Sequence, residues 1–181
     1  MTDPVFHSEP ELSPSDIETL TGLSPATLRD WRHRGYIEGL GTIQTNGRWK
    51  YDWLDALILF VYREVSECGM DISTVRLWAE HVARLVTYRK LMRLGYRISH
   101  PRYYQFSKHR EFAKNYYGEI ESGEKWAGYP VEELGAQTPP VPASVLIDCE
   151  DLSSRLPSGF DEVYGALLKD LLREQKEQGL D

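Results

Sequence analysis

Two helix-start signals on either side of a glycine constrain the fold of this chain more than any other feature. Ser13-Pro14 and Ser24-Pro25 each place a hydroxyl at a helix N-cap and a proline at the first helical position. Gly22 lies between the two signals, where its freedom to adopt a positive φ permits a sharp turn. The sequence therefore predicts two short helices, over 14–21 and over 25–34.

The second of these helices is basic, and Gly35 directly after it is a natural helix stop. Two short helices around a glycine turn form the helix-turn-helix pattern, in which the second helix enters the major groove of DNA. We therefore expect DNA contacts from the polar and aromatic side chains of this helix. They are Ser24, Thr27, Arg29, Trp31, Arg32, His33 and Arg34.

A glycine-rich segment over 36–51 follows, and Asn46-Gly47 marks the turn of an expected β-hairpin. Arg48 and Lys50 beside its tip are expected to bind the phosphate backbone, which supplies affinity without sequence information. We expect Tyr51 to contact DNA at the same place. Next comes a helix over 55–68 that carries one apolar stripe and ends at a glycine. The stripe consists of Leu57, Ile58, Val61, Tyr62 and Val65. This order of elements indicates a winged helix-turn-helix.

A further helix is expected to run unbroken from Ser73 to Leu94, on the order of 30 Å. Apolar residues recur along it at alternating steps of three and four, with Arg89 interrupting the series. They are Val75, Trp78, Val82, Leu85 and Met92. Such a series is typical of a seam against a partner helix, and we expect a homodimer to form through it. The alternative is that this stripe packs on the C-terminal half of the same chain.

Three segments in this region resemble the signatures of the MerR family of winged helix-turn-helix regulators. They are T-G-L-S-P-A-T-L-R-D-W at Thr21 to Trp31, N-G-R-W-K-Y-D-W-L-D-A-L at Asn46 to Leu57 and G-M-D-I-S-T-V-R at Gly69 to Arg76. The resemblance covers Leu12 to about Leu94. It implies a homodimer bound to a near-palindromic operator, with the C-terminal part deciding what the regulator senses.

The match departs from the family pattern at two places. Asp30 stands where the family usually has an aromatic residue, and Arg48-Trp49-Lys50 replaces an aromatic-arginine order before Tyr51. An acidic side chain on this helix can accept a hydrogen bond from cytosine N4 or orient Arg29 or Arg34, but it repels phosphate. The details of base readout therefore do not follow from the resemblance.

The net charge of −7 is unevenly divided along the 181 residues. Between Ser24 and Tyr51, five arginines and lysines outnumber two acidic residues, whereas fifteen acidic and six basic residues follow position 110. Basic residues also predominate over 72–110, where the run from Arg84 to Arg93 fits a solvated helix face as well as a DNA or partner contact. The segment expected to meet phosphate is therefore basic within an acidic protein.

The C-terminal half begins with aromatic residues interleaved with basic ones, over 96–117. This composition favours a half-buried sheet of short strands, and it is also typical of a surface that stacks on single-stranded nucleic acid. A proline-rich connection over 138–142 precedes an expected buried strand over 144–149 and an amphipathic helix over 160–175. The apolar side of that helix consists of Val163, Leu167, Leu168, Leu171 and Leu172.

Little in the chain indicates catalysis. Its five histidines show no metal-ligand spacing, and it has no phosphate loop, nucleophile elbow or acid/base pair, so we expect neither an enzyme nor a cofactor. Cys68 and Cys149 lie in apolar contexts and are expected to be buried. The chain has no long apolar stretch and no signal-peptide pattern, which predicts a cytoplasmic protein.

These features predict a mainly α protein with small β elements, divided into three parts. They are a winged helix-turn-helix domain over 11–71, a linking and dimerisation helix over 72–95 and an α+β region over 96–181. The expected function is that of a bacterial or phage transcription regulator of MerR type, which binds specific double-stranded DNA as a homodimer. Its C-terminal region is the expected place for a small-molecule effector or a protein partner. Two alternatives remain, a phage-type accessory protein (an excisionase or small terminase subunit) and an adaptor that docks a protein.

Overall fold

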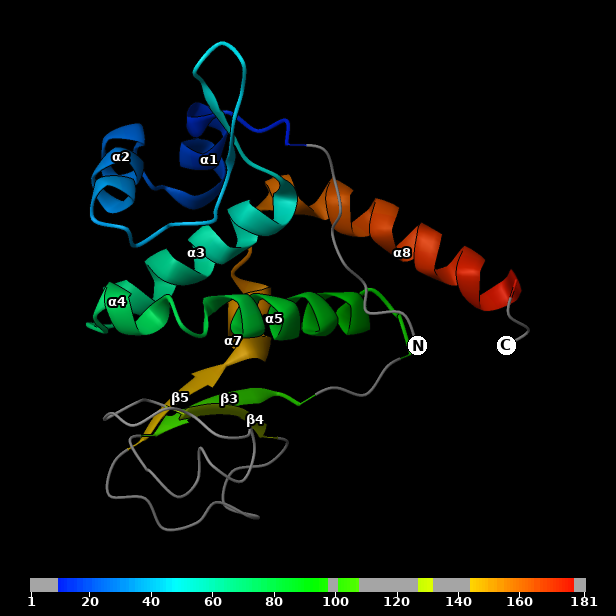
Figure 1. Ribbon diagram of the computed structural model, residues 1–181. Coiled ribbons are helices and arrows are strands. Elements are labelled where there is room, and N and C mark those ends of the chain that lie inside the picture. The colour runs from blue at the N-terminus through cyan, green and yellow to red at the C-terminus, as the bar shows by residue number, and fades with distance from the viewer. Residues whose placement is uncertain (1–9, 98–100, 108–126, 132–143, 178–181) are drawn as a thin grey trace.

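The computed structural model describes residues 10–97, 101–107, 127–131 and 144–177 (Figure 1). This part of the chain is mainly helical and contains two small antiparallel sheets, as the sequence predicts. One cluster of buried apolar side chains extends from Leu12 to Leu171. Within the described ranges, no helix combines the length and the hydropathy needed to cross a membrane.

Helices α1 (Pro14–Thr21) and α2 (Pro25–His33) form where the sequence predicts them. The hydroxyls of Ser13 and Ser24 each accept a hydrogen bond from the backbone N–H three residues further on, which caps the two helices. Gly22 has a φ of 75° and directs the chain from one helix into the next. Both caps and the glycine turn are therefore confirmed.

Strands β1 (Thr42–Ile43) and β2 (Trp49–Lys50) form the expected antiparallel hairpin, with its turn at Asn46-Gly47. The base of the hairpin is fixed to the start of the described chain, because Leu12 and Tyr51 pair as an isolated β-bridge. In Figure 1 the hairpin projects beyond the two short helices. Its tip is consequently free to meet another molecule.

Helix α3 (Trp53–Glu67) is the central element of the N-terminal half. Asp52 and Asp55 form a capping box at its start. The expected apolar stripe is buried together with the residues between its members: Ala56, Leu57, Ile58, Leu59, Phe60, Val61, Tyr62 and Val65. Cys68 follows as the C-cap and is exposed, so the expectation that it is buried is wrong. The helix ends there, and this side chain lies outside the core.

The single unbroken helix expected over 73–94 is also wrong. The structure has a short α4 (Ile72–Val75) and a separate α5 (Ala79–Arg93). Trp78 has a φ of −129°, which is far from the helical value and separates the two helices. Two shorter helices therefore replace the one long helix that the sequence predicts.

Most of the expected dimer seam lies inside the chain. Val75, Val82 and Leu85 are at most 7% exposed and belong to the core, Trp78 packs half-buried against it, and Met92 is partly exposed. Because α5 packs on α3 and on C-terminal elements, the three buried side chains cannot also contact a partner helix. The stripe packs within the chain, and the homodimer itself stays a prediction.

A second sheet follows in the C-terminal half. Strand β3 (Tyr103–Ser107) lies between β4 (Ala127–Val131) and β5 (Ser144–Asp148), and all neighbouring strands are antiparallel. The expectation of short strands in the aromatic segment is confirmed for β3. The remainder of that segment, after position 107, and the proline-rich connection lie outside the described residues.

The chain passes from β5 directly into helix α7 (Cys149–Ser154), so the strand expected over 144–149 ends one residue early. Cys149 is buried, as predicted. Leu146 is exposed whereas Ile147 is buried, because successive side chains of a strand point to opposite faces. The face of β5 that carries Ile147 packs on the core, whereas Leu146 points away from it.

A short 3-10 helix, η1 (Ser158–Phe160), leads into α8 (Asp161–Glu177), which confirms the last expected helix to within a few residues. Tyr164 and Leu171 are buried, but Leu172 is 42% exposed and lies outside the core. In Figure 1, α8 begins near the start of α3 and extends away from it.

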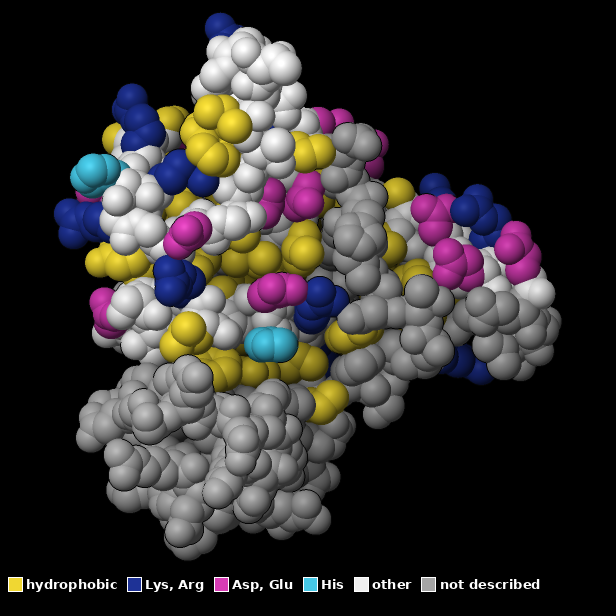
Figure 2. Space-filling model, in the orientation of Figure 1, with side chains coloured by type: hydrophobic (Ala, Val, Ile, Leu, Met, Phe, Trp, Pro, Cys, Tyr) yellow, Lys and Arg dark blue, Asp and Glu magenta, His cyan; other side chains and the backbone are white. Residues whose placement is uncertain are grey.

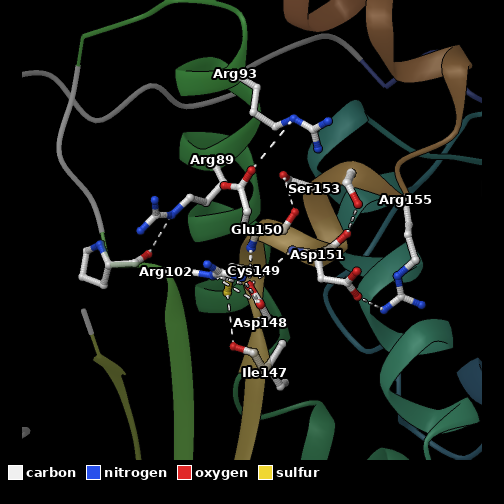
Figure 3. Close-up of polar contacts among 12 residues, drawn as sticks. Arg89, Arg93, Arg102, Ile147, Asp148, Cys149, Glu150, Asp151, Ser153 and Arg155 are labelled. Atoms are coloured by element: carbon white, nitrogen blue, oxygen red, sulfur yellow. Dashed lines mark hydrogen bonds and ion pairs between the residues drawn. The ribbon is translucent and has the colours of Figure 1, made fainter. Parts of the chain in front are cut away.

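Ion pairs surround α7, and Figure 3 shows those that Arg93, Arg102 and Arg155 form with Glu150, Asp148 and Asp151. Arg155 Nη1 lies 2.7 Å from Glu64 Oε2, which connects the end of α7 to α3. Within the C-terminal half, Arg102 Nη2 lies 2.7 Å from Asp148 Oδ2, which fixes the residue before β3 to the end of β5. The C-terminal elements are thus attached to the N-terminal helices by polar contacts as well as by the shared core.

Candidate nucleic-acid interface

A groove of about 630 Å³ lies between the start of α1, the outer side of α2 and strand β2. It is lined by Ser13, Pro14, Pro25, Leu28, Arg29, Arg32, His33, Arg48, Trp49, Lys50 and Tyr51. Four of these residues are arginine or lysine and one is histidine, whereas none is acidic, although the whole chain has a net charge of −7. Figure 2 shows the basic side chains gathered over α2. The groove therefore has basic walls and an apolar floor.

Arg29 and His33 extend from α2 along this groove. They are four residues apart, so they share one face of the helix, and both are exposed. Within the described ranges, neither side chain forms an ion pair or a hydrogen bond with another residue. Leu28 and Trp31 hold the opposite face of α2 in the core. Arg29 and His33 are consequently the α2 side chains best placed to reach an external ligand.

Arg32 is engaged within the chain. Its Nη2 donates to the Leu40 carbonyl at 2.8 Å and to the Tyr51 hydroxyl at 3.2 Å. The guanidinium carbon also lies 3.4 Å from the centroid of the Trp49 ring, in a cation–π contact. Arg32 is therefore tied to the hairpin, which argues against the base contact expected from the sequence; that contact stays a prediction.

Two other expected DNA contacts are core residues. Trp31 is 8% exposed and packs against Tyr62, with the ring centroids 6.0 Å apart. Tyr51 is 1% exposed, and its hydroxyl accepts the hydrogen bond from Arg32. Trp31 follows Leu28 by three residues and so shares the inward face of α2. This burial argues against direct DNA contacts from Trp31 and Tyr51, which stay predictions.

The remaining expected contacts on α2 also have partners within the chain. Arg34 Nε lies 3.0 Å from the carboxylate of Asp30, so Asp30 orients this arginine, one of the roles that the sequence allowed for it. The Ser24 hydroxyl lies 2.9 Å from that of Thr27 and accepts the Thr27 N–H at 3.1 Å. Of these residues, none lines the groove.

The hairpin contributes two cations that differ in their freedom. Arg48 is exposed beside the turn, and its side chain has no polar partner among the described residues. Lys50 Nζ donates to the Glu11 carbonyl at 2.6 Å. Hydrogen bonds from Ser13 hold the pKa of Asp16 below its ordinary value, and the charge of Lys50 adds to this effect. Arg48 is thus the freer of the two cations.

Asp55 anchors the chain that leads into the hairpin. Its Oδ2 accepts hydrogen bonds from the Gly41 N–H at 3.0 Å and from the Asp52 N–H at 3.1 Å. Burial raises the pKa of this carboxyl to about 6, against the opposing effect of these hydrogen bonds and of the nearby Arg32 charge. The attachment of the hairpin to α3 therefore includes a group that titrates in the mildly acidic range.

The sequence analysis did not identify Trp49 as a groove residue. An aromatic side chain in a short strand that follows an arginine-rich helix is a signal for a stacked guanidinium. That signal does not say which arginine stacks on the ring, because the distance between each arginine and the ring depends on the loop between α2 and the hairpin. Of the expected residues, the structure brings together Arg29, Arg32, His33, Arg48, Lys50 and Tyr51, with Trp49 added.

The described residues include no group of three or more His, Cys, Asp or Glu side chains placed to hold a metal ion. The candidate interface is defined by the basic groove and by Arg29, His33 and Arg48 around it, whose side chains have no polar partner in the part of the chain that the structure describes. The chain matches no family model, no curated protein and no solved structure.

Proposed function

We propose that this chain is a winged helix-turn-helix protein that binds double-stranded DNA as a homodimer and regulates transcription. In this proposal α2 is the recognition helix and the β1–β2 hairpin is the wing. The observation that carries the proposal is the groove between these two elements, which has five basic side chains and no acidic one in a protein of net charge −7. The three signatures that resemble the MerR family support the same assignment.

The free side chains suggest which contacts provide sequence specificity and which provide affinity. Arg29 and His33 lie on the exposed face of a helix that fits the major groove, where arginine pairs with the O6 and N7 acceptors of guanine. Arg48 at the hairpin tip and Lys50 beside it are placed for phosphate contacts, which position a protein without reading sequence. We therefore assign specificity to α2 and much of the affinity to the hairpin.

The proposed homodimer requires a surface other than the seam expected from the sequence. Val75, Val82 and Leu85 are buried within the chain, so they are not available for pairing. A dimer that recognises two half-sites about one helical turn apart therefore uses residues outside the buried face of α5.

Selection from a random duplex library at physiological salt tests the proposal. We expect enrichment of a near-palindromic motif, because a two-fold symmetric dimer places two copies of α2 on symmetric half-sites. Binding without an enriched motif would favour a different function, in which the protein organises DNA for recombination or packaging. If the protein binds no duplex, the DNA-binding function is wrong and the adaptor becomes the better proposal.

Two substitutions separate base contacts from phosphate contacts. Arg29→Ala is expected to weaken binding to the selected motif by about 1–3 kcal/mol and binding to random duplex by much less. Arg48→Ala is expected to weaken binding to both duplexes alike and to reduce the salt dependence. Arg173→Ala on α8 removes the same charge from a side chain that is 67% exposed, and it serves as the control. Equal losses on both duplexes for Arg29→Ala would rule out its role in base readout.

A further inference from the structure

One side chain, Arg32, connects α2 to both arms of the hairpin. Its guanidinium reaches the Leu40 carbonyl before β1, the Trp49 ring within β2 and the Tyr51 hydroxyl after β2. A guanidinium is planar and carries five N–H donors in a fixed arrangement, so it can stack on a ring and donate to two acceptors at the same time. Three simultaneous contacts fix both the position and the orientation of the group.

Among the described residues, the other attachments of the hairpin lead to α3 and to the segment before α1, where Lys50 Nζ also donates to the Glu11 carbonyl. The Leu12–Tyr51 bridge holds the end of β2, and the Asp55 carboxylate holds Gly41 before β1. The ladder itself contains only two residue pairs, and a two-stranded ribbon of that length is marginally stable alone. The angle between the hairpin and α2 therefore depends on a contact between these two elements, and Arg32 supplies one at Trp49, the first residue of β2.

We propose that Arg32 is a positioning residue for DNA binding, which holds the hairpin at a fixed distance from α2 so that Arg48 meets the phosphate backbone while Arg29 meets the bases. The inference deepens the proposed function and rests on it. Arg32 acts through Trp49 and the hairpin and makes no essential contact with DNA. The groove lined by Arg29 and Arg48 is then preformed, so that binding does not have to order the hairpin.

A double-mutant cycle on DNA affinity tests the proposal. Binding to the selected duplex, or to random duplex if no motif is enriched, is measured across salt concentrations for Arg32→Ala, Arg48→Ala and the double variant. Loss of one phosphate contact reduces the slope of log K against log salt by about 0.9. We expect Arg32→Ala alone to lower affinity about tenfold and to abolish the effect of Arg48→Ala. Additive effects on affinity and slope would mean that Arg32 contacts phosphate itself, and an unchanged slope in Arg32→Ala would equally overturn the proposal.

Trp49→Leu tests the same contact without removing a charge. We expect it to reduce both the affinity and the salt slope, because the Arg48 contact with phosphate is lost although Arg48 is still present. Trp49→Phe keeps an aromatic face for the guanidinium and is expected to restore most of the binding. Full affinity in Trp49→Leu would contradict the proposal. This variant also replaces Arg32→Ala in the cycle if the arginine variant does not fold.

Amide hydrogen exchange tests the contact in the absence of DNA. The Gln44 N–H donates to the Arg48 carbonyl at 2.8 Å across the hairpin. We expect this amide to exchange at least several times faster in Arg32→Ala, while the amides of α1 and α3 keep their rates. Unchanged exchange at Gln44 would show that Arg32 does not hold the hairpin. If the unmodified protein binds no duplex, the proposed function fails, whereas this measurement still decides whether Arg32 positions the hairpin.

Discussion

Gly41 is the residue at the entrance to the hairpin where both the backbone and the surrounding space exclude a side chain. Its φ is 75°, and a Cβ there would lie 2.9 Å from Cε1 of Tyr51 and 3.1 Å from the Lys50 carbonyl. We expect Gly41→Ala to lower the free energy of unfolding by about 2–3 kcal/mol, which urea denaturation would measure. Gly39→Ala is the control, because its φ is 89° with no atom within 4 Å, and it should cost only about 1 kcal/mol. Equal losses would mean that the close approach of Tyr51 has no energetic effect.

The Asp55 carboxyl should make stability depend on pH. Burial raises its pKa to about 6 in the folded protein, above the ordinary value of 3.8, so the folded state binds the proton more tightly than the unfolded state. The stabilisation is complete below pH 3.8 and is lost as the pH rises through 6. We expect the protein to lose about 1 kcal/mol relative to Asp55→Asn across this range, since solvent screens a partly exposed group. The measurement is urea unfolding of both proteins at several pH values, and a constant difference between them would contradict the raised pKa.

The composition of α2 indicates a basic interface, but it does not say which side chains are free. Arg29 and Arg32 are equivalent in the sequence, yet only Arg32 meets an acceptor and a ring supplied by the hairpin. The partners of Arg32 lie later in the chain than α2, and a pattern read within α2 does not show how close they come in the fold. The inward position of Trp31 could have been predicted, because it follows the buried Leu28 by three residues on a helix.

Helix α2 depends on a cap that also lies close to the candidate interface. Ser24 Oγ accepts the Thr27 N–H at 3.1 Å and satisfies one of the free donors at the start of the helix. We expect Ser24→Ala to lower the free energy of unfolding by about 1 kcal/mol, as measured by thermal or urea denaturation. Ser15→Ala on α1 is the matched control, because that side chain is exposed and is not a cap, so it should change stability by less than about 0.5 kcal/mol. Similar losses in the two variants would show that the cap at Ser24 contributes nothing specific.

Elements with signals in their own residues could be predicted from the sequence, and elements defined by distant packing could not. The first two helices carry their capping serines and prolines, and the hairpin carries Asn46-Gly47 at its turn. The break between α4 and α5 contains neither glycine nor proline, so nothing local marks it. The burial of Val75 and Ala79 on either side of the break indicates that packing against the core determines it.

The N-terminal helices and the C-terminal third share one core across the whole molecule. Phe160 of η1 lies edge-on to Trp53 at the start of α3, with the ring centroids 5.7 Å apart. Tyr164 of α8 is fully buried, and its hydroxyl lies 3.3 Å from that of Thr87 on α5. Dividing the sequence into three successive regions does not reveal this packing, since contacts between distant residues leave no periodic pattern. The elements that form the candidate interface are therefore supported by residues more than a hundred positions away.

Phe160→Ala tests whether this shared core makes the chain unfold as one unit. The side chain is 1% exposed, so its removal should lower the free energy of unfolding by about 3–5 kcal/mol. Because Phe160 contacts α3, we expect amide exchange to accelerate in α1 and α3 as well as in α8. Leu172→Ala on α8 is the control, since its side chain is 42% exposed and its loss should cost less than about 1 kcal/mol. Acceleration confined to α8 would mean that the N-terminal elements, which build the basic groove, fold without the C-terminal third of the chain. In that case a ligand or partner bound to the C-terminal third could not alter the groove through the core.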